Sequence, residues 1–578
     1  MLNKNPKKML TKFSSWLPCL IICSVMVFSL LASLLIATPQ PAHAATLPAY
    51  RYTKTFDTSG GFAQGNSVAT DNSGNIYIAG QFQGTVVFDG VGGSDSVTSA
   101  NTDSFLTRYN ANGSYAWTKT FDTSASGAFA ESEGVATDGN GNIYVAGDFN
   151  ANVVFDGVGG SDTQNGGTND DSYLTKYNAD GSYAYTKTFD VSASGSSFAF
   201  NLGVTTDSSN NVYVTGCYGR TVVFDGVGGS DSRNGGSRGS GYVTKYNANG
   251  NYVFTKTSDA STAGAFAEGR GVATDSSGNI YMTGDFEGTV TFDGTGGSDT
   301  QDGGTNGDSY LTKYNADGSY AYTKSLDVTA GGSNAQGNSV ATDSSGNVYI
   351  AGQFQGTVVF DGVGGSDAQT ARSGTSDSFI TRYNANGSYA FTKTFDVSAS
   401  GAVAEGRGVA VDSSGNIYET GEFQGTVIFD GTGGSDSQDG GTNSDSYLTK
   451  YNADGSYAYT KTFDMSAGGS LARGKGVATD SSGNVYVTGI FSGTVGFDGS
   501  GGSDVRTSSN NSFLTSFQVA NASTPSGGSA SPAATPPGAP NTGVGVYMTD
   551  PLPALAICSL ISAALVISAV TYSKKIKQ

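Results

Sequence analysis

The chain has 578 residues and a formal net charge of −19; 85 residues are glycine, 31 tyrosine and 31 phenylalanine, and only 14% are charged. This composition is typical of short strands joined by tight turns. The acidic balance disfavours binding to DNA, RNA or anionic lipid, so we expect no nucleic-acid partner.

The N-terminus, residues 1–44, predicts a secretory signal peptide. Four lysines precede an apolar run over residues 16–37, and the small-residue sequence Ala42-His43-Ala44 follows. This order predicts cleavage after Ala44. The alternative is an uncleaved membrane anchor, because an apolar run of this length is long enough to span a bilayer.

The central part of the chain, residues 45–520, repeats one segment seven times. The sequence Val-Ala-Thr-Asp, or a close variant, recurs every 67 to 69 residues. It ends at Asp71, Asp138, Asp207, Asp275, Asp343, Asp412 and Asp480. One such unit is too small to bury its own apolar faces, so the fixed period predicts that neighbouring units pack on one another.

The fourth copy contains four predicted strands. Period-two alternation and enrichment in Tyr, Val, Ile and Thr indicate strands rather than helices. The predicted strands cover residues 271–275, 280–286, 308–314 and 319–325, with turns at 276–279 and 315–318. The long connection between the second and third strands contains residues 289–292, Thr-Val-Thr-Phe, which indicate an accessory strand.

Four antiparallel strands in each of seven units predict an all-β fold, a β-propeller. An open β-solenoid or a string of separate units is the competing architecture. The last copy ends after its third strand, residues 512–517, whereas the missing fourth strand is present at residues 50–56. An open array gains nothing from this offset. We therefore expect a closed seven-bladed propeller of four-stranded antiparallel blades, with the last blade completed by the N-terminal strand.

Two segments of the last copies resemble a known family of repeats. They are Gly-Val-Ala-Thr-Asp-Ser-Ser-Gly-Asn-Val-Tyr-Val-Thr-Gly at 476–489 and Asp-Ser-Tyr-Leu-Thr-Lys-Tyr-Asn-Ala-Asp-Gly-Ser at 446–457. Both resemble the bacterial β-propeller repeats known as SBBP repeats. The resemblance covers residues 50–518 and implies a bacterial exported propeller. It implies no activity and no catalytic residues.

The C-terminal part predicts attachment to the cell surface. Residues 521–543 form a Ser-, Pro- and Gly-rich linker that ends in Ala-Pro-Asn-Thr-Gly, and residues 544–578 hold an apolar segment and a lysine-containing tail. This order resembles a Gram-positive sorting signal of the LPxTG type, which implies sortase cleavage between Thr542 and Gly543 and attachment to the cell wall. The alternative is a retained transmembrane helix with a positively charged inner tail. Both interpretations place the propeller outside the cell.

The predicted exported region offers little for catalysis. It contains no histidine, since His43 lies in the signal, and Cys217 is its only cysteine. Ser-His-Asp and Cys-His catalysis are excluded, together with the commonest zinc and haem ligands and any intramolecular disulfide. We expect a protein that is not an enzyme and has no cofactor. Paired carboxylates leave a polysaccharide-active enzyme as a less favoured alternative.

Candidate ligand-binding residues precede the first strand of each copy. Ligands commonly bind to loops held by a rigid scaffold. Two positions, four and two residues before the first-strand valine, vary between copies, and we expect them on loops around the mouth of the central channel. The candidates are Gln64, Glu131, Glu133, Glu268, Arg270, Gln336, Glu405, Arg407, Arg473 and Lys475, and the same positions hold Asn66, Phe200, Leu202 and Asn338 in other copies. The alternative interpretation is ordinary solvated loop residues.

A second repeated pattern, Asp-Gly-x-Gly-Gly-Ser-Asp, offers candidate calcium ligands. The pairs Asp89/Asp95 and Asp293/Asp299 are examples. Calcium takes about six to eight oxygens, and two carboxylates with glycine-loop carbonyls supply several of them. However, Asp beside Gly is also ordinary turn chemistry. The sequence therefore predicts no definite metal site.

These features predict an extracellular cell-surface protein that binds an unidentified glycan or protein as a non-catalytic adhesion module. Its other expected partners are sortase and the cell wall, or the membrane. A structural cell-wall scaffold without a specific ligand is the alternative function.

Overall fold

The computed structural model describes residues 47–519, except 91, 124–125, 158, 192–196, 227, 261, 263, 329–332, 373, 398–400, 466–470 and 500–501. The predicted signal peptide, linker, sorting motif and C-terminal apolar segment lie outside the described residues. Within them, no helix has the length and apolar character that a membrane crossing requires.

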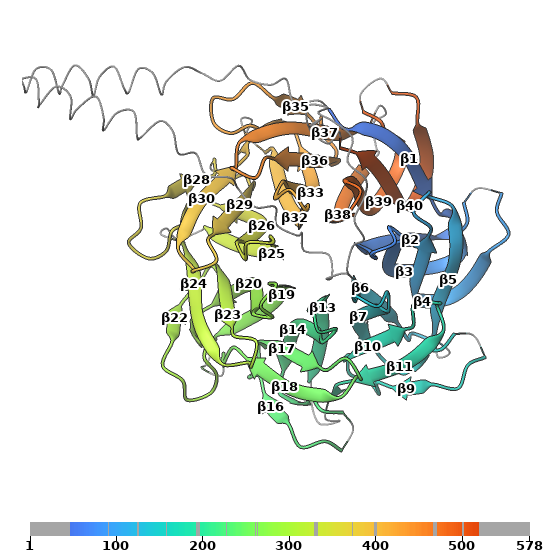
Figure 1. Ribbon diagram of the computed structural model, residues 1–578, viewed down its shortest axis with the longest axis horizontal. Coiled ribbons are helices and arrows are strands. Elements are labelled where there is room, and N and C mark those ends of the chain that lie inside the picture. Colours follow the sequence, from blue (N-terminus) through green and yellow to red (C-terminus); the bar gives the residue numbers. More distant parts are fainter. Residues whose placement is uncertain are drawn as a thin grey trace, which may run out of the picture. The chain divides into compact units, whose positions relative to one another are not determined.

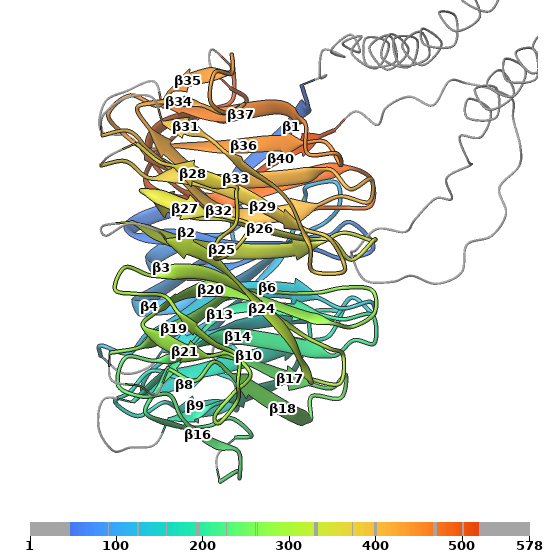
Figure 2. The ribbon, with the colours of Figure 1, turned by 90° about the vertical axis from the view of Figure 1, so that its left-hand side faces the viewer.

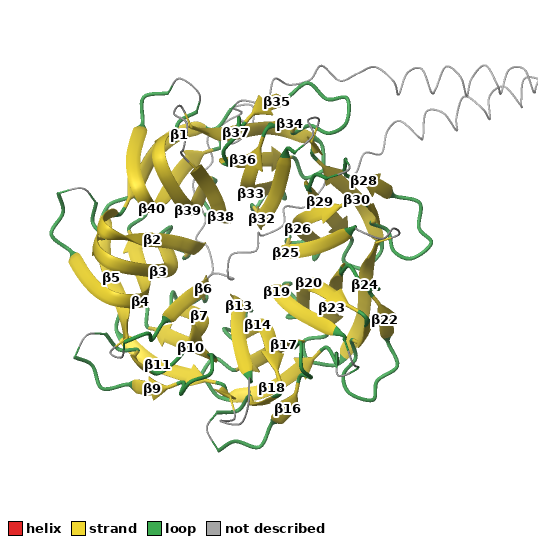
Figure 3. Ribbon diagram, turned by 180° about the vertical axis from the view of Figure 1, so that it is seen from behind, coloured by secondary structure: helices red, strands yellow, loops and turns green. Residues whose placement is uncertain are grey.

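The predicted all-β, propeller-like fold is confirmed. Every regular element in the described part of the chain is a β-strand, and the sheets stand around a common axis (Figures 1 and 3). The fourth repeat shows the pattern, with its strands paired antiparallel in the order β19, β20, β23 and β24 from the axis outward. Their bounds are Phe266–Thr274, Ile280–Glu287, Asp308–Tyr314 and Tyr320–Val328.

The core lies between neighbouring sheets. Tyr213 and Val243 from the third repeat are fully buried against Ile280, Met282 and Phe286 from the fourth. Alternation places such residues on the two faces of each sheet, and both faces are covered by neighbours. Burying a large apolar side chain stabilises a fold by roughly 1.5–3 kcal/mol. The same arrangement recurs in each repeat, so the stability of every sheet depends on the next one.

The predicted accessory strand is confirmed, and it belongs to a short hairpin. In the fourth repeat β21 (Thr289–Thr291) pairs with β22 (Thr300–Asp302). In the fifth, β27 (Thr357–Val359) also pairs with the outer strand of the preceding repeat, through Asp327↔Val359. These hairpins lie toward the left of Figure 2. The additional length of each repeat therefore ties neighbouring repeats together at the rim.

The predicted pairing of the N-terminal strand is also confirmed. Strand β1 (Ala49–Thr55) pairs antiparallel with β40 (Val505–Gln518), which carries the third strand of the last repeat. The innermost strands of the repeats pack on one another in sequence order, and the last of them contacts the first. In the described chain these strands are β2 (Asp57–Thr70), β6 (Ala130–Thr137), β13 (Phe198–Thr206), β19, β25 (Asn334–Thr342), β32 (Val403–Val411) and β38 (Leu471–Thr479).

Hydrogen bonds between side chains and backbone link the innermost strands at one end. Thr137 Oγ1 donates to the Thr70 carbonyl over 2.8 Å, and Thr70 Oγ1 donates to the Thr479 carbonyl over 2.9 Å. Other repeats form the same link. In the sixth repeat Val411 has no hydroxyl to donate. The threonine of the repeated Val-Ala-Thr-Asp sequence therefore joins the first repeat to the last.

Candidate ligand site at the channel mouth

A cavity of about 350 Å³ lies at one end of the central axis. Each innermost strand contributes to its lining the repeated valine or its neighbour and, at the position two residues before that valine, Asn66, Glu133, Leu202, Arg270, Asn338, Arg407 or Lys475. We call the residues at this position the mouth residues. A second cavity of about 250 Å³ continues along the axis and is lined by small and apolar residues and by the linked threonines. Valines such as Val272 and Val340 line both cavities and separate them.

Each mouth residue is placed by a β-bulge. In the fourth repeat the register passes from Gly269↔Gly284 to Gly271↔Thr283, which leaves Arg270 without a cross-strand partner. A bulge turns such an extra residue away from the regular alternation. The two strands approach so closely beside it that a Cβ on Gly284 would lie 1.8 Å from the Glu268 carbonyl oxygen. Glycine at this position therefore permits the bulge.

The prediction that the candidate residues lie on loops was wrong. The innermost strands begin several residues earlier than predicted, for example at Phe266 instead of residue 271. All the candidates therefore lie within strands. The bulge shifts the alternation by one residue, and the bulge residue has glycine on one or both sides, so the period-two pattern is interrupted in the sequence at this point.

Each repeat has two candidate positions on its innermost strand, and the structure adds a third side chain from the second strand. The residue two before each mouth residue faces a residue of the second strand, as in Glu131↔Asp148, Glu268↔Asp285 and Glu405↔Glu422. The corresponding second-strand residues in the other repeats are Gln81, Cys217, Gln353 and Ile490. These residues were not predicted as site residues. The sequence feature that could have identified them is their variation between otherwise similar copies.

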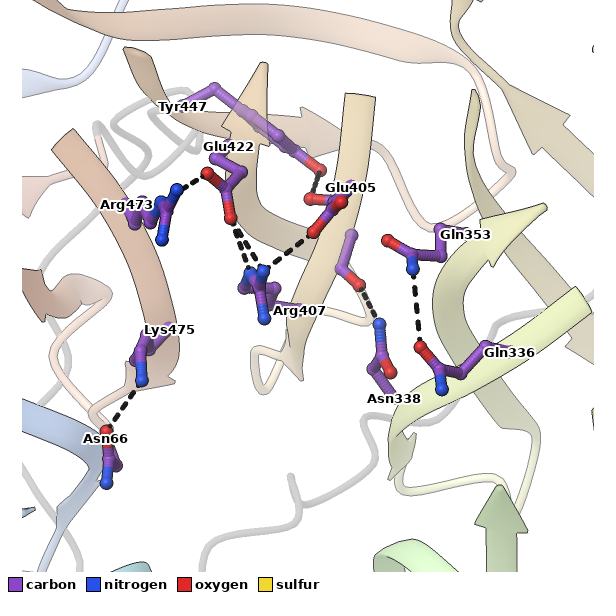
Figure 4. Close-up of polar contacts among 11 residues, drawn as sticks. Asn66, Gln336, Asn338, Gln353, Glu405, Arg407, Glu422, Tyr447, Arg473 and Lys475 are labelled. Carbon is purple, nitrogen blue, oxygen red and sulfur yellow. Dashed lines mark hydrogen bonds and ion pairs between the residues drawn. The ribbon is translucent and has the colours of Figure 1, made fainter. Parts of the chain in front are cut away.

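In the sixth repeat the three side chains form an ion-pair cluster (Figure 4). The guanidinium of Arg407 lies between two carboxylates, with Nη2 2.7 Å from Glu405 Oε2 and 2.6 Å from Glu422 Oε1. Arg473 of the next repeat contacts the other oxygen of Glu422 over 2.6 Å. The fourth repeat is similar: Arg270 lies 3.2 Å from Glu268 and 3.0 Å from Asp285.

Amide side chains connect the other repeats across the mouth. Lys475 Nζ donates to Asn66 Oδ1 over 2.9 Å, and Asn66 Nδ2 donates to Glu133 Oε1 over 3.1 Å. Asn338 Nδ2 donates to the carbonyl of Gly406 over 2.7 Å. The mouth therefore carries acidic, basic and amide groups, and their combination differs from one sector of the ring to the next.

Burial shifts the pKa of several of these groups. It raises the pKa of Glu133 to about 7, against the opposing effect of Lys475. It also raises the pKa of Glu131 and lowers that of Lys475. The third repeat contributes apolar groups instead: Phe200 stacks on Phe198 with ring centroids 5.1 Å apart.

The weak calcium candidates have a structural role in turns. The carboxylate of Asp89 accepts hydrogen bonds from the backbone N–H groups of Ser94 and Asp95, which hold its pKa below the usual value although burial acts in the opposite direction. Asp293 accepts the same two bonds, one of them from the N–H of Asp299. Among the described residues no group of three or more His, Cys, Asp or Glu side chains could hold a metal ion. Closing this turn accounts for the repeated pattern.

Comparisons with known proteins support the repeat type. The family described as Beta-propeller repeat (SBBP) matches residues 328–353 and 466–489. An uncharacterized WD repeat-containing protein of Acanthamoeba polyphaga mimivirus is 26% identical over 208 residues, which cover 32% of this chain and 14% of that protein. The chain thus spans only a small part of that relative.

Several solved structures are similar at low identity. A quinohemoprotein alcohol dehydrogenase from Pseudomonas putida is 12% identical, with a TM-score of 0.33 and coverage of 86% of this chain and 81% of that chain. A protein of unknown function from Dyadobacter fermentans is 12% identical (TM-score 0.34, 82% and 100% covered), and an ulvan lyase is 15% identical (TM-score 0.35, 77% and 92% covered). At these scores the similarity carries no argument about function. The two matched segments support the SBBP β-propeller repeat family that the sequence resembles.

Proposed function

We propose that the chain forms a closed seven-bladed propeller that acts outside the cell as a non-catalytic binding or adhesion module. Its ligand, a glycan or a protein, binds at the mouth of the central channel. The strand pairing between β1 and β40 and the cyclic packing of the innermost strands support the closed ring.

One observation carries the assignment of the site. Along each innermost strand the repeats are nearly identical at the valine and threonine positions, but the bulge position holds Asn, Glu, Leu, Arg, Asn, Arg and Lys. These seven side chains, of five residue types, surround a single cavity of about 350 Å³. Cavities of roughly 300–1,000 Å³ with a few placed polar groups are the usual size for small-ligand or side-chain binding.

An array of glycans and extracellular proteins, probed with recombinant residues 45–520, tests the proposal. The test variant replaces Asn66, Asn338 and Lys475 with alanine. The matched control replaces the exposed turn residues Asp180 and Asp317 with asparagine. We expect ligands that bind the unmodified protein and the control but not the mouth variant. Binding that is equal in all three would contradict a site at the mouth, and no binding at all would favour the structural scaffold.

The proposed location follows from the sorting motif and can be tested separately. We expect residues up to Thr542 in the cell-wall fraction, detected by mass spectrometry after peptidoglycan digestion. Replacing Thr542 with alanine is expected to shift the protein to the membrane fraction. If the unmodified protein is already in the membrane fraction, the retained transmembrane helix is the correct interpretation.

A further inference from the structure

The second repeat carries a group of carboxylates at the mouth that forms no ion pair within the described chain. Glu131 and Asp148 face each other across the first two strands, and Glu133 is the mouth residue between them in sequence. Asp170, in the loop before the third strand, also acts electrostatically on Glu131 and Asp148. Four acidic side chains therefore act on one another electrostatically in one sector of the ring.

Asp148 is the member that points to a missing partner. The residue is only 7% exposed, yet its side chain forms no hydrogen bond or ion pair with any residue in the described chain. The groups that act on it are Glu133, Glu131 and Asp170, all of the same charge. An isolated buried carboxylate is costly unless it is paired or protonated. Lys475 does not fill this place, because it acts on Glu131 and Glu133 and donates to Asn66.

The fourth and sixth repeats show what occupies this place elsewhere in the same molecule. In both, the two positions equivalent to Glu131 and Asp148 also carry carboxylates, and the mouth residue is arginine. Arg270 and Arg407 each insert a guanidinium between the two carboxylates. In the second repeat only the charge of the mouth residue differs, because Glu133 stands where the fourth and sixth repeats have arginine. The second repeat therefore retains the two walls of a guanidinium site and lacks its own guanidinium.

We propose that this sector of the mouth, formed by Glu131, Glu133 and Asp148, binds the guanidinium of an arginine side chain from a peptide or protein partner. The proposal rests on the proposed binding function and specifies its ligand chemistry. A guanidinium fits because its planar fork pairs with two carboxylates at once. A metal ion fits less well, because no group of three or more His, Cys, Asp or Glu side chains in the described chain is arranged to hold one.

Titration calorimetry with the tripeptide Gly-Arg-Gly, at low salt and neutral pH, tests the proposal. We expect one site per chain, and at least tenfold weaker binding of the citrulline and lysine analogues. Asp148→Asn is expected to weaken binding at least tenfold, and Glu133→Arg is expected to abolish it, because the chain's own guanidinium then fills the site. Arg270→Glu is expected to create a second site in the fourth repeat.

Melting temperatures measured without peptide distinguish loss of the site from misfolding of a variant. Glu133→Arg is expected to melt at a higher temperature than Glu133→Gln, because the new guanidinium compensates Glu131 and Asp148. A lower melting temperature than Glu133→Gln would overturn the proposal. So would equal binding of the citrulline or lysine analogue, binding that survives Glu133→Arg, or binding of calcium in place of the peptide. If Gly-Arg-Gly does not bind but array ligands still depend on the mouth residues, the guanidinium site is wrong and the proposed function stands.

Discussion

Glu419 is a buried acid in a position that is apolar in other repeats. It lies in β33 (Ile417–Gln424), is 1% exposed, and corresponds to Met282 in the fourth repeat and Ile350 in the fifth. One carboxyl oxygen is hydrogen-bonded to Ser378, and the other has no hydrogen-bond partner in the described chain. Burial raises the pKa of Glu419 from 4.5 to about 8. The folded protein therefore holds this side chain in its neutral form at pH 7.

This shift makes stability depend on pH with a definite sign. Between pH 4.5 and about 8 the folded state keeps a proton on Glu419 that the unfolded state has lost. The free energy of unfolding therefore falls as pH rises through this window. Each pKa unit corresponds to roughly 1.4 kcal/mol, so from pH 4 to pH 7 the loss from this one group is about 3 kcal/mol.

Replacing Glu419 with methionine removes this contribution. Methionine has a similar volume and already occupies the equivalent buried position at Met282. Ser378 Oγ keeps a hydrogen-bond acceptor, since it also donates to the Gly352 carbonyl over 3.2 Å. We expect the gain in stability over the unmodified protein to be about 3 kcal/mol larger at pH 7 than at pH 4. With an unfolding entropy of roughly 1 kcal/mol/K for a domain of this size, the difference is about 3 °C in melting temperature.

Thermal melts of recombinant residues 45–520 at several pH values between 4 and 8 measure this effect. The control is Ile350→Met, a change to methionine at the equivalent position of another repeat, which we expect to leave the pH dependence unchanged. Curves for Glu419→Met and the unmodified protein that run parallel across this range would refute the reasoning. The other buried acids, such as Asp171 and Asp377, titrate equally in all three proteins.

Three further predictions concern closure and burial. Deleting residues 50–56 is expected to lower the melting temperature and promote self-association, because β40 loses a partner strand and its cross-strand contacts, worth about 0.2–1 kcal/mol each. Val411→Thr is expected to raise the free energy of unfolding by about 0.5–1.5 kcal/mol, seen as a higher midpoint of chemical unfolding, because its hydroxyl would donate to the Thr342 carbonyl and complete the series of links. Cys217 is expected to resist thiol reagents in the folded protein, because it is 3% exposed and burial raises its pKa.

Each of these predictions has a contradicting outcome. Deleting seven residues from the linker, within 521–540, should leave the melting temperature unchanged, and equal melting of both deletions would refute a closed ring. A lower unfolding midpoint for Val411→Thr would mean that the hydroxyl finds no acceptor. Labelling of Cys217 at the rate of a free thiol would mean that its strand opens in the native state.

The sequence by itself determined the repeated architecture. The period, the alternation of Tyr, Val and Ile and the turn residues are local properties, and the structure follows them closely. Asn210, which replaces glycine in one turn, adopts a φ of 62°, a conformation that asparagine tolerates. The pairing of residues 50–56 with the last repeat was predictable, because the last repeat lacks its fourth strand and one additional strand precedes the first repeat.

Only the tertiary structure decided which side chains meet at the mouth. A bulge changes the facing of one residue, and nothing in local propensity marks Arg270 as that residue, because its neighbours are glycines. The pairing of Glu268 with Asp285 depends on register between two strands, and the contact of Asp327 with Val359 joins different repeats. The unpaired state of Asp148 is likewise a property of its surroundings, because an identical carboxylate in another repeat is neutralised by an arginine that the fold places beside it.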